Sequence, residues 1–137
     1  MEFLQPLGWA RPKGYSNGIA ASGRMVFVAG QVGWDEREVF RTHDLVGQAR
    51  QALTNIVGIL AQAGAAPADI VRLNWYLADK EEYNARLAEI GEAYREIIGR
   101  HFPAMTALQV AGFVEVGAKI EIEATAMVPA AADPARA

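Results

Sequence analysis

The chain has 137 residues, of which 52% are hydrophobic and 21% charged, a balance typical of one globular domain with its own core. The formal net charge of −3 and the lack of a basic run argue against a nucleic-acid-binding surface. The absence of cysteine excludes disulfides, thiolate nucleophiles and zinc–thiolate sites, and the two histidines have no second ligand at metal-binding spacing.

The first part of the chain is predicted to hold a loop and a small hairpin. Residues 1–18 contain two prolines and three glycines and are interpreted as an irregular lead-in. Ile19–Ser22 and Met25–Ala29 have the composition of two short strands joined by a tight turn. The strand pattern breaks at Gly30–Trp34, and an exposed loop is expected up to His43.

An amphipathic helix is predicted to follow this loop. Asp44 or Thr42 caps its start, and Gly64, with Pro67 soon after, ends it. Its apolar residues recur at helical spacing and form one stripe: Leu45, Ala49, Ala52, Leu53, Ile56, Leu60 and Ala63.

A strand and a second helix are predicted next. Ile70–Leu77 alternates, with Val71, Leu73, Trp75 and Leu77 on one face and Arg72, Asn74 and Tyr76 on the other. Asp79 and Glu82 are spaced as a capping box, and Gly99 ends the helix that they begin. Its apolar stripe is Tyr83, Leu87, Ile90, Tyr94 and Ile97.

The chain is predicted to close with two strands and a tail. Thr106–Val110 is the first strand and Ala118–Val128 the second. In the second, Lys119, Glu121 and Glu123 point one way and Ile120, Ile122 and Ala124 the other. Residues 1–128 are therefore expected to form one domain, and 129–137 a flexible C-terminal tail.

This order of elements predicts an α+β fold with a mixed sheet and two helices on one face. Strands joined through helices lie parallel if they are neighbours, and two helices cover only one face of such a sheet. The other face carries both charged and apolar groups, too mixed for a core. An oligomer that packs sheet faces around a central space would account for it.

Several motifs in order resemble one known family. They are GYSNG (Gly14–Gly18), VAGQVG (Val28–Gly33), QARQALTNIVGILAQAGA (Gln48–Ala65), DIVRLNWYLAD (Asp69–Asp79) and FPA…IEIEATA. Over residues 12–128 the chain resembles the Rid (YjgF) family of reactive-intermediate enamine/imine deaminases. The resemblance implies a chorismate-mutase-like fold assembled as a homotrimer, with a barrel of sheets at its centre. It also implies small-molecule clefts at the subunit interfaces, and hydrolysis of enamines or imines to a keto acid and ammonia without metal or cofactor.

Three residues match the family's functional positions. By resemblance, Tyr15 is the cleft tyrosine and Glu121 the acid that orients or activates the attacking water, so these two are the predicted catalytic residues. Gly30 matches a glycine whose backbone approaches the ligand, as a missing Cβ permits. The remaining residues predicted to bind substrate are Gln31, Ala29, Met105, Thr106, Ala88 and Trp34.

Three positions depart from the family pattern. Met105 stands where active deaminases carry the arginine of a Pro-Ala-Arg motif, Ala29 replaces a serine, and Ala88 replaces an asparagine. A thioether cannot clamp a carboxylate as a guanidinium does, so a ligand carboxylate would be left without its cation. The ligand is therefore expected to be less acidic or more hydrophobic than 2-aminoacrylate, or another cation takes over. Lys13, Arg72 and Lys119 are the candidates.

Each of these residues also has a structural interpretation. Glu121 can pair with Arg72 or Lys119 across neighbouring strands, and Tyr15 can cap the core from its loop. Met105, Trp34 and Thr106 can be packing residues, and Gly30 can serve a bend at the strand end.

The function also has alternatives, which are a non-catalytic metabolite-binding trimer, a nuclease and a structural or chaperone-like trimer. The acidic balance weighs against the nuclease. Because no apolar run approaches about 18 residues and no secretory signal begins the sequence, no membrane partner and a cytoplasmic location are expected.

Overall fold

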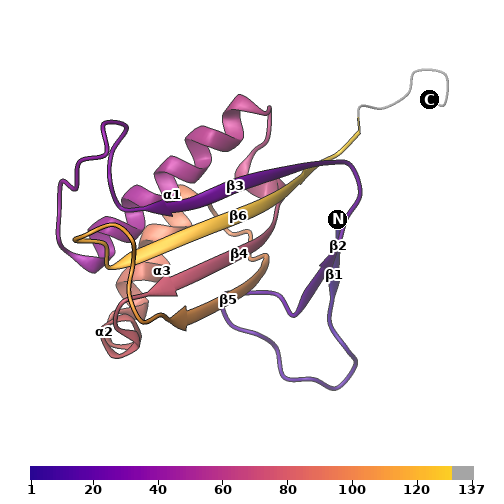
Figure 1. Cartoon of the computed structure of the whole chain (residues 1–137). Coiled ribbons are helices and arrows are strands. Elements are labelled where there is room, and N and C mark those ends of the chain that lie inside the picture. The colour runs from indigo at the N-terminus through magenta and orange to yellow at the C-terminus, as the bar shows by residue number, and fades with distance from the viewer. Residues whose placement is uncertain (131–137) are drawn as a thin grey trace.

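The computed structural model describes residues 1–130 and shows an α+β fold built on a four-stranded mixed sheet (Figure 1). The strands are β3 (Arg24–Val32), β4 (Ile70–Leu77), β5 (Ala104–Gln109) and β6 (Ile120–Val128), in the order β3-β6-β4-β5. β6 is antiparallel to both of its neighbours, and β4 is parallel to β5. The mixed sheet predicted from the sequence is confirmed. Of the predicted tail at 129–137, residues 131–137 lie outside the described residues.

The helices cover one face of the sheet, as predicted (Figure 1). α1 (Leu45–Gln62) packs against β3 and β6, and α3 (Leu87–Ile97) packs beside α1. The Asp44 side chain caps α1 by accepting a hydrogen bond from the Gly47 N–H at 3.0 Å. None of these helices, within residues 1–130, has the length and apolarity needed to cross a bilayer.

The predicted second helix is in fact two helices, α2 (Lys80–Ala85) and α3, separated at Arg86. Arg86 leaves the helical conformation, with φ −119° and ψ 22°. Its guanidinium donates to Glu89 on α3 and to Asp44 at the start of α1. The interruption therefore coincides with a contact that ties α3 to α1, which apolar periodicity cannot reveal.

The predicted hairpin of Ile19–Ser22 with Met25–Ala29 is wrong. β2 (Gly18–Ala20) pairs instead with β1 (Glu2–Leu4), a strand inside the segment predicted to be irregular. β3 pairs with β6 along almost its whole length. A nine-residue partner with a buried face stabilises β3 more than a two-stranded hairpin would.

Two β-bulges shift the predicted strand patterns. β3 continues to Val32 through the predicted break at Gly30, because the register shifts between Val28 and Gln31. A second shift at the start of β4 buries Ile70 in the core, and Val71 is only half-buried. The strands β5 and β6 begin at Ala104 and Ile120, not at 106 and 118, and β4 lies between them.

Gln48 is a fully buried polar side chain that joins α1 to the start of β6. Its amide nitrogen donates to the carbonyls of Thr42 (3.1 Å) and Gly117 (2.9 Å). Its amide oxygen accepts from the Lys119 N–H at 2.8 Å. Gly33 makes room for it, since a Cβ there would lie 2.5 Å from the Gln48 Cβ. These bonds fix the strand that carries Glu121.

Gln48→Leu is expected to lower the free energy of unfolding by roughly 3 kcal/mol, because it leaves two carbonyls and one N–H without their partner in the core. Urea unfolding measures this. The matched control is Gln62→Leu on the exposed end of the same helix, expected within about 0.5 kcal/mol of wild type. Equal stability of the two variants would contradict the assigned role of Gln48.

Candidate functional site

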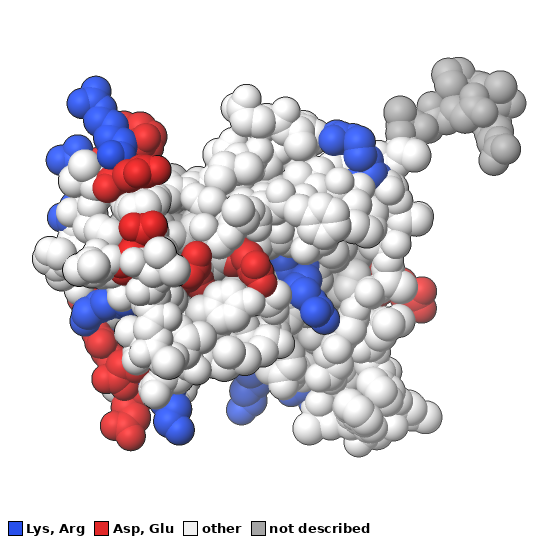
Figure 2. Space-filling view, in the orientation of Figure 1, with Lys and Arg blue, Asp and Glu red and all other residues white. Residues whose placement is uncertain are grey.

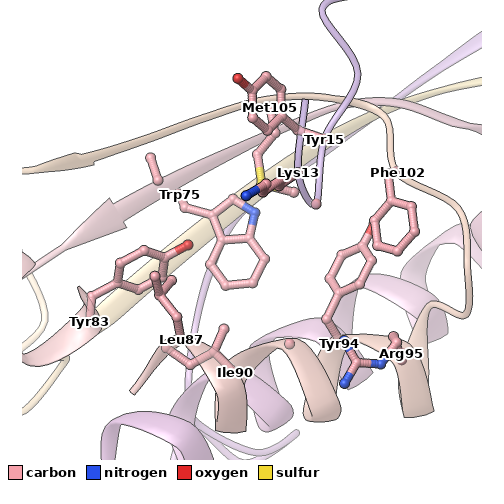
Figure 3. Close-up of a pocket in the computed structure, with 13 residues that line it drawn as sticks. Lys13, Tyr15, Trp75, Tyr83, Leu87, Ile90, Tyr94, Arg95, Phe102 and Met105 are labelled. Carbon is pink, nitrogen blue, oxygen red and sulfur yellow. The ribbon is translucent and has the colours of Figure 1, made fainter. Parts of the chain in front are cut away.

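A pocket of about 440 Å³ lies beside the edge strand β5, on the side of the sheet that the helices cover (Figure 3). Met105 is on this side because it lies opposite the buried Leu73 in the β4–β5 register. Aromatic side chains dominate the walls: Tyr15, Trp75, Tyr83, Tyr94 and Phe102. Aliphatic groups and two cations complete them: Leu87, Ile90, Met105, Ala107, Lys13 and Arg95.

The loop before β2 places Tyr15 beside Met105. The Ser16 N–H donates to the Pro103 carbonyl at 3.0 Å, and the Ser16 hydroxyl donates to the Phe102 carbonyl. Ser16 also forms a parallel bridge with Ala104 at the start of β5. The structure therefore brings Tyr15 and Met105, two of the predicted site residues, to the same pocket.

The aromatic walls form a connected cluster. The Trp75 ring centroid lies 6.3 Å from those of both Tyr83 and Tyr94, and Tyr94 stacks on Phe102 at 5.7 Å. The Tyr94 hydroxyl donates to the His101 carbonyl. Burial raises the pKa of Tyr83 and of Tyr94, so both phenols remain neutral donors at physiological pH.

A second group of predicted residues surrounds Glu121 on the uncovered face of the sheet. The half-buried Glu121 lies against Gly30, where a Cβ would come 2.4 Å from the Glu121 Oε1 atom. The missing Cβ of Gly30, which lies at the β3 bulge, therefore gives the carboxylate its space. The Gln31 amide folds back over this bulge and donates to the Ala29 carbonyl at 3.0 Å.

Glu121 differs from its neighbour Glu123 in its partners. Glu123 accepts hydrogen bonds from the Asn74 amide (3.0 Å) and the Tyr76 hydroxyl (2.6 Å), and this bond raises the pKa of Tyr76. Within residues 1–130, the Glu121 side chain has no hydrogen bond or ion pair. The alternative that it pairs with Lys119 does not occur here, because the Lys119 ammonium binds Glu82 at 2.8 Å.

The two groups lie on different parts of one chain. Tyr15 and Met105 lie at the β5 edge on the helix-covered side, whereas Glu121 and Gly30 lie toward the β3 edge on the uncovered side. β4 separates the strand of Met105 from the strand of Glu121. One copy of the chain therefore does not bring its own Tyr15 and Glu121 into one cavity.

The other predicted site residues lie outside the pocket. Thr106 is exposed on the uncovered face, opposite Asn74. Ala88 is exposed on α3 and does not line the pocket, although Leu87 and Gly91 beside it do. Trp34 packs on Phe40 with 5.7 Å between ring centroids, and its carbonyl accepts from Asn55 at 2.7 Å.

Trp75 and Arg95 also line this pocket, although neither is among the site residues predicted from the sequence. The sequence pattern indicates only that Trp75 lies on the apolar face of its strand. The spacing of Leu87, Gly91 and Arg95, each four residues apart, places them on one face of α3 and could have indicated Arg95.

Of the three cations proposed to replace the missing arginine, only Lys13 lines the pocket. Lys119 forms an ion pair with Glu82, and the exposed Arg72 does not line the pocket. In the described part of the chain, no three His, Asp or Glu side chains are arranged to hold a metal ion.

Comparison with known proteins identifies the relatives of this chain. The family model described as Endoribonuclease L-PSP matches residues 9–128. A crystal structure of a Rid-family protein of unknown function from Yersinia pestis superimposes with a TM-score of 0.82, at 32% identity over 93% of this chain and 98% of the other. The chain belongs to the Rid (YjgF) family.

Two relatives in this family differ in how far their names specify an activity. A RutC family protein from Pyrococcus horikoshii is 36% identical over 82% of this chain and 85% of its own. The human protein named 2-iminobutanoate/2-iminopropanoate deaminase is 32% identical over 82% of this chain and 79% of its own. Membership in the Rid family and its fold, expected from the motifs, are thereby confirmed.

Proposed function

We propose that three copies of this chain assemble through their uncovered sheet faces and hydrolyse enamines or imines, releasing ammonia, at the clefts between subunits. The observation that carries this proposal is the division of the predicted site. Tyr15 and Met105 lie at one edge of the sheet and Glu121 and Gly30 toward the other. A neighbouring copy that joins the two edges would supply each pocket with a carboxylate.

The uncovered face supports an assembly of this kind. Phe27, Met25 and Leu108 project from it with 72%, 52% and 45% of their surfaces exposed. Figure 2 views this side and shows a largely uncharged surface interrupted by a short row of acidic and basic side chains. Exposed apolar area of this extent on a sheet is typical of a surface that a partner covers.

The proposed reaction needs a positioned water and one base. An enamine tautomerises to the imine, and water held by Glu121 attacks the imine carbon while the Glu121 carboxylate takes its proton. That proton is returned to the nitrogen, which gives a carbinolamine bearing a hydroxyl and an NH2 group. The carboxylate then takes the hydroxyl proton and passes it to the nitrogen as the carbon–nitrogen bond breaks, so that ammonia leaves and the C=O of a keto acid forms. Because imines hydrolyse unaided, holding water and imine together supplies much of the acceleration.

The substrate is proposed to differ from that implied by the name of the human relative. Met105 offers no charge to a carboxylate, and the wall around it is formed mainly by aromatic and aliphatic side chains. A soft, apolar wall favours a ligand that is more hydrophobic than 2-aminoacrylate.

Two measurements test this proposal: the molecular mass of the protein in solution and its rate of ammonia release from imines. Sedimentation equilibrium is expected to give three times the chain mass of 14.8 kDa, and the protein is expected to accelerate ammonia release from imines generated in place from neutral and bulky amino acids. A monomer without activity would contradict the proposal. A trimer that binds small molecules saturably without releasing ammonia would favour the second candidate, a metabolite sensor, to which the missing charge at Met105 points.

A further inference from the structure

We propose that the pocket beside Met105 selects 2-imino acids with an aromatic or branched apolar side chain, and that Lys13 and Trp75 together hold their carboxylate. The inference rests on the proposed function, since it names the substrate class of that site. It is carried by three observations on the walls of the pocket: an unpartnered indole N–H, an unbalanced positive charge and a surplus of aromatic surface.

The Trp75 indole provides the first observation. Only 2% of Trp75 is exposed, and its Nε1 atom is buried without a hydrogen-bond partner within residues 1–130. A buried donor left unpaired is costly, so such groups are rare without a reason. Trp75 lines the pocket, and in Figure 3 its ring nitrogen is on the side of Lys13 and Met105. The geometry points to a ligand atom as the missing acceptor.

The charge of the pocket provides the second observation. Lys13 and Arg95 line it, and none of the other described lining residues is acidic. Neither cation forms an ion pair within residues 1–130. The Ser16 bonds to Phe102 and Pro103 fix the loop on which Lys13 lies. The two cations outnumber the single carboxylate that a neighbouring copy would bring, so a pocket with this charge and a donor in an apolar setting still favours an anion. A carboxylate can accept from Lys13 and Trp75 at once.

The aromatic walls of the pocket provide the third observation. The volume of about 440 Å³ lies in the range of sites for drug-sized ligands. A methyl group, as in 2-iminopropanoate, would leave most of the exposed surface of Tyr83 and Leu87 uncovered. A phenyl or isobutyl group would bury it, which adds affinity in proportion to the apolar area removed from water. Arg95, at the α3 side, remains available to a polar group at the far end of the ligand.

Stable keto acids test this selection without any chemistry, because their C=O replaces the C=NH of the imine. Calorimetric titration of the full chain is expected to show phenylpyruvate binding at least tenfold more tightly than pyruvate. Lys13→Gln is expected to weaken phenylpyruvate about tenfold, by loss of a charge-assisted hydrogen bond. Lys13→Arg, which keeps the charge, is expected to retain most of the affinity. The matched control Lys80→Gln removes an exposed lysine outside the pocket and should change nothing.

Trp75→Phe tests the indole donor and is also expected to weaken phenylpyruvate about tenfold, with thermal unfolding followed to show that the core survives. The inference would be overturned if phenylpyruvate and pyruvate bound with equal affinity, or if Lys13→Gln bound phenylpyruvate as tightly as the wild type. It would also be overturned if neither keto acid showed saturable binding up to millimolar concentration. These outcomes are separate from the deaminase proposal, because imine hydrolysis accompanied by failed selection would leave that proposal standing.

Discussion

Glu121→Gln is expected to lower the protein-dependent release of ammonia from imines by about a hundredfold or more, the range for loss of a general base. The amide keeps the shape of the side chain but cannot take a proton from the attacking water. Glu121 suits this role because its side chain has no hydrogen bond or ion pair within residues 1–130 and because Gly30, which lacks a Cβ, leaves room for its Oε1 atom. Ammonia release from imines generated in place measures the effect.

Glu123→Gln is the matched control for this variant. Glu123 is two residues along the same strand and on the same face, but it accepts from Asn74 and Tyr76. A glutamine oxygen still accepts both bonds, so activity and molecular mass are expected to stay close to wild type. Equal activity of the Glu121 and Glu123 variants and the wild type would reject Glu121 as the base.

Local sequence signals predicted the elements whose boundaries depend on neighbouring residues. The start of α1 follows from the Asp44 cap and the bounds of β4 from its alternation, and both agree with the structure. The predicted boundaries are wrong where contacts with residues distant in the sequence determine the end of a strand or helix. β3 extends to Val32 because β6 offers a long partner, and α2 and α3 separate where Arg86 binds Asp44, 42 residues away.

The sequence predicted several residues of the candidate site but not how these residues are arranged in space. Family motifs indicated Tyr15 and Met105, and the structure places them in one pocket. No sequence pattern separates Glu121 from them, because that depends on the strand order, in which β4 lies between β5 and β6. The unpartnered Trp75 Nε1 atom was equally hidden, since an alternating apolar strand predicts only that the residue is buried.

Met105→Arg is expected to raise activity on 2-aminoacrylate about tenfold to a hundredfold. An arginine on this side of β5 would reach the same pocket as Tyr15 and add a bidentate, charge-assisted clamp for the carboxylate, worth about 1.5–3 kcal/mol. Because the longer side chain also occupies part of the aromatic space, the preference for bulky substrates is expected to fall. Initial rates on imines from small and bulky amino acids measure both changes.

Two controls separate the charge from the change of shape. Met105→Leu keeps the wall apolar and is expected to gain nothing, whereas Met105→Lys supplies a single-point cation and should gain less than arginine. Adding Glu121→Gln to Met105→Arg should abolish the gain, because the clamp only binds the substrate and the base is still required. An arginine variant that assembles normally but gains no activity on 2-aminoacrylate would mean that Met105 does not lie where the substrate carboxylate binds, and the proposed cleft would then be wrong.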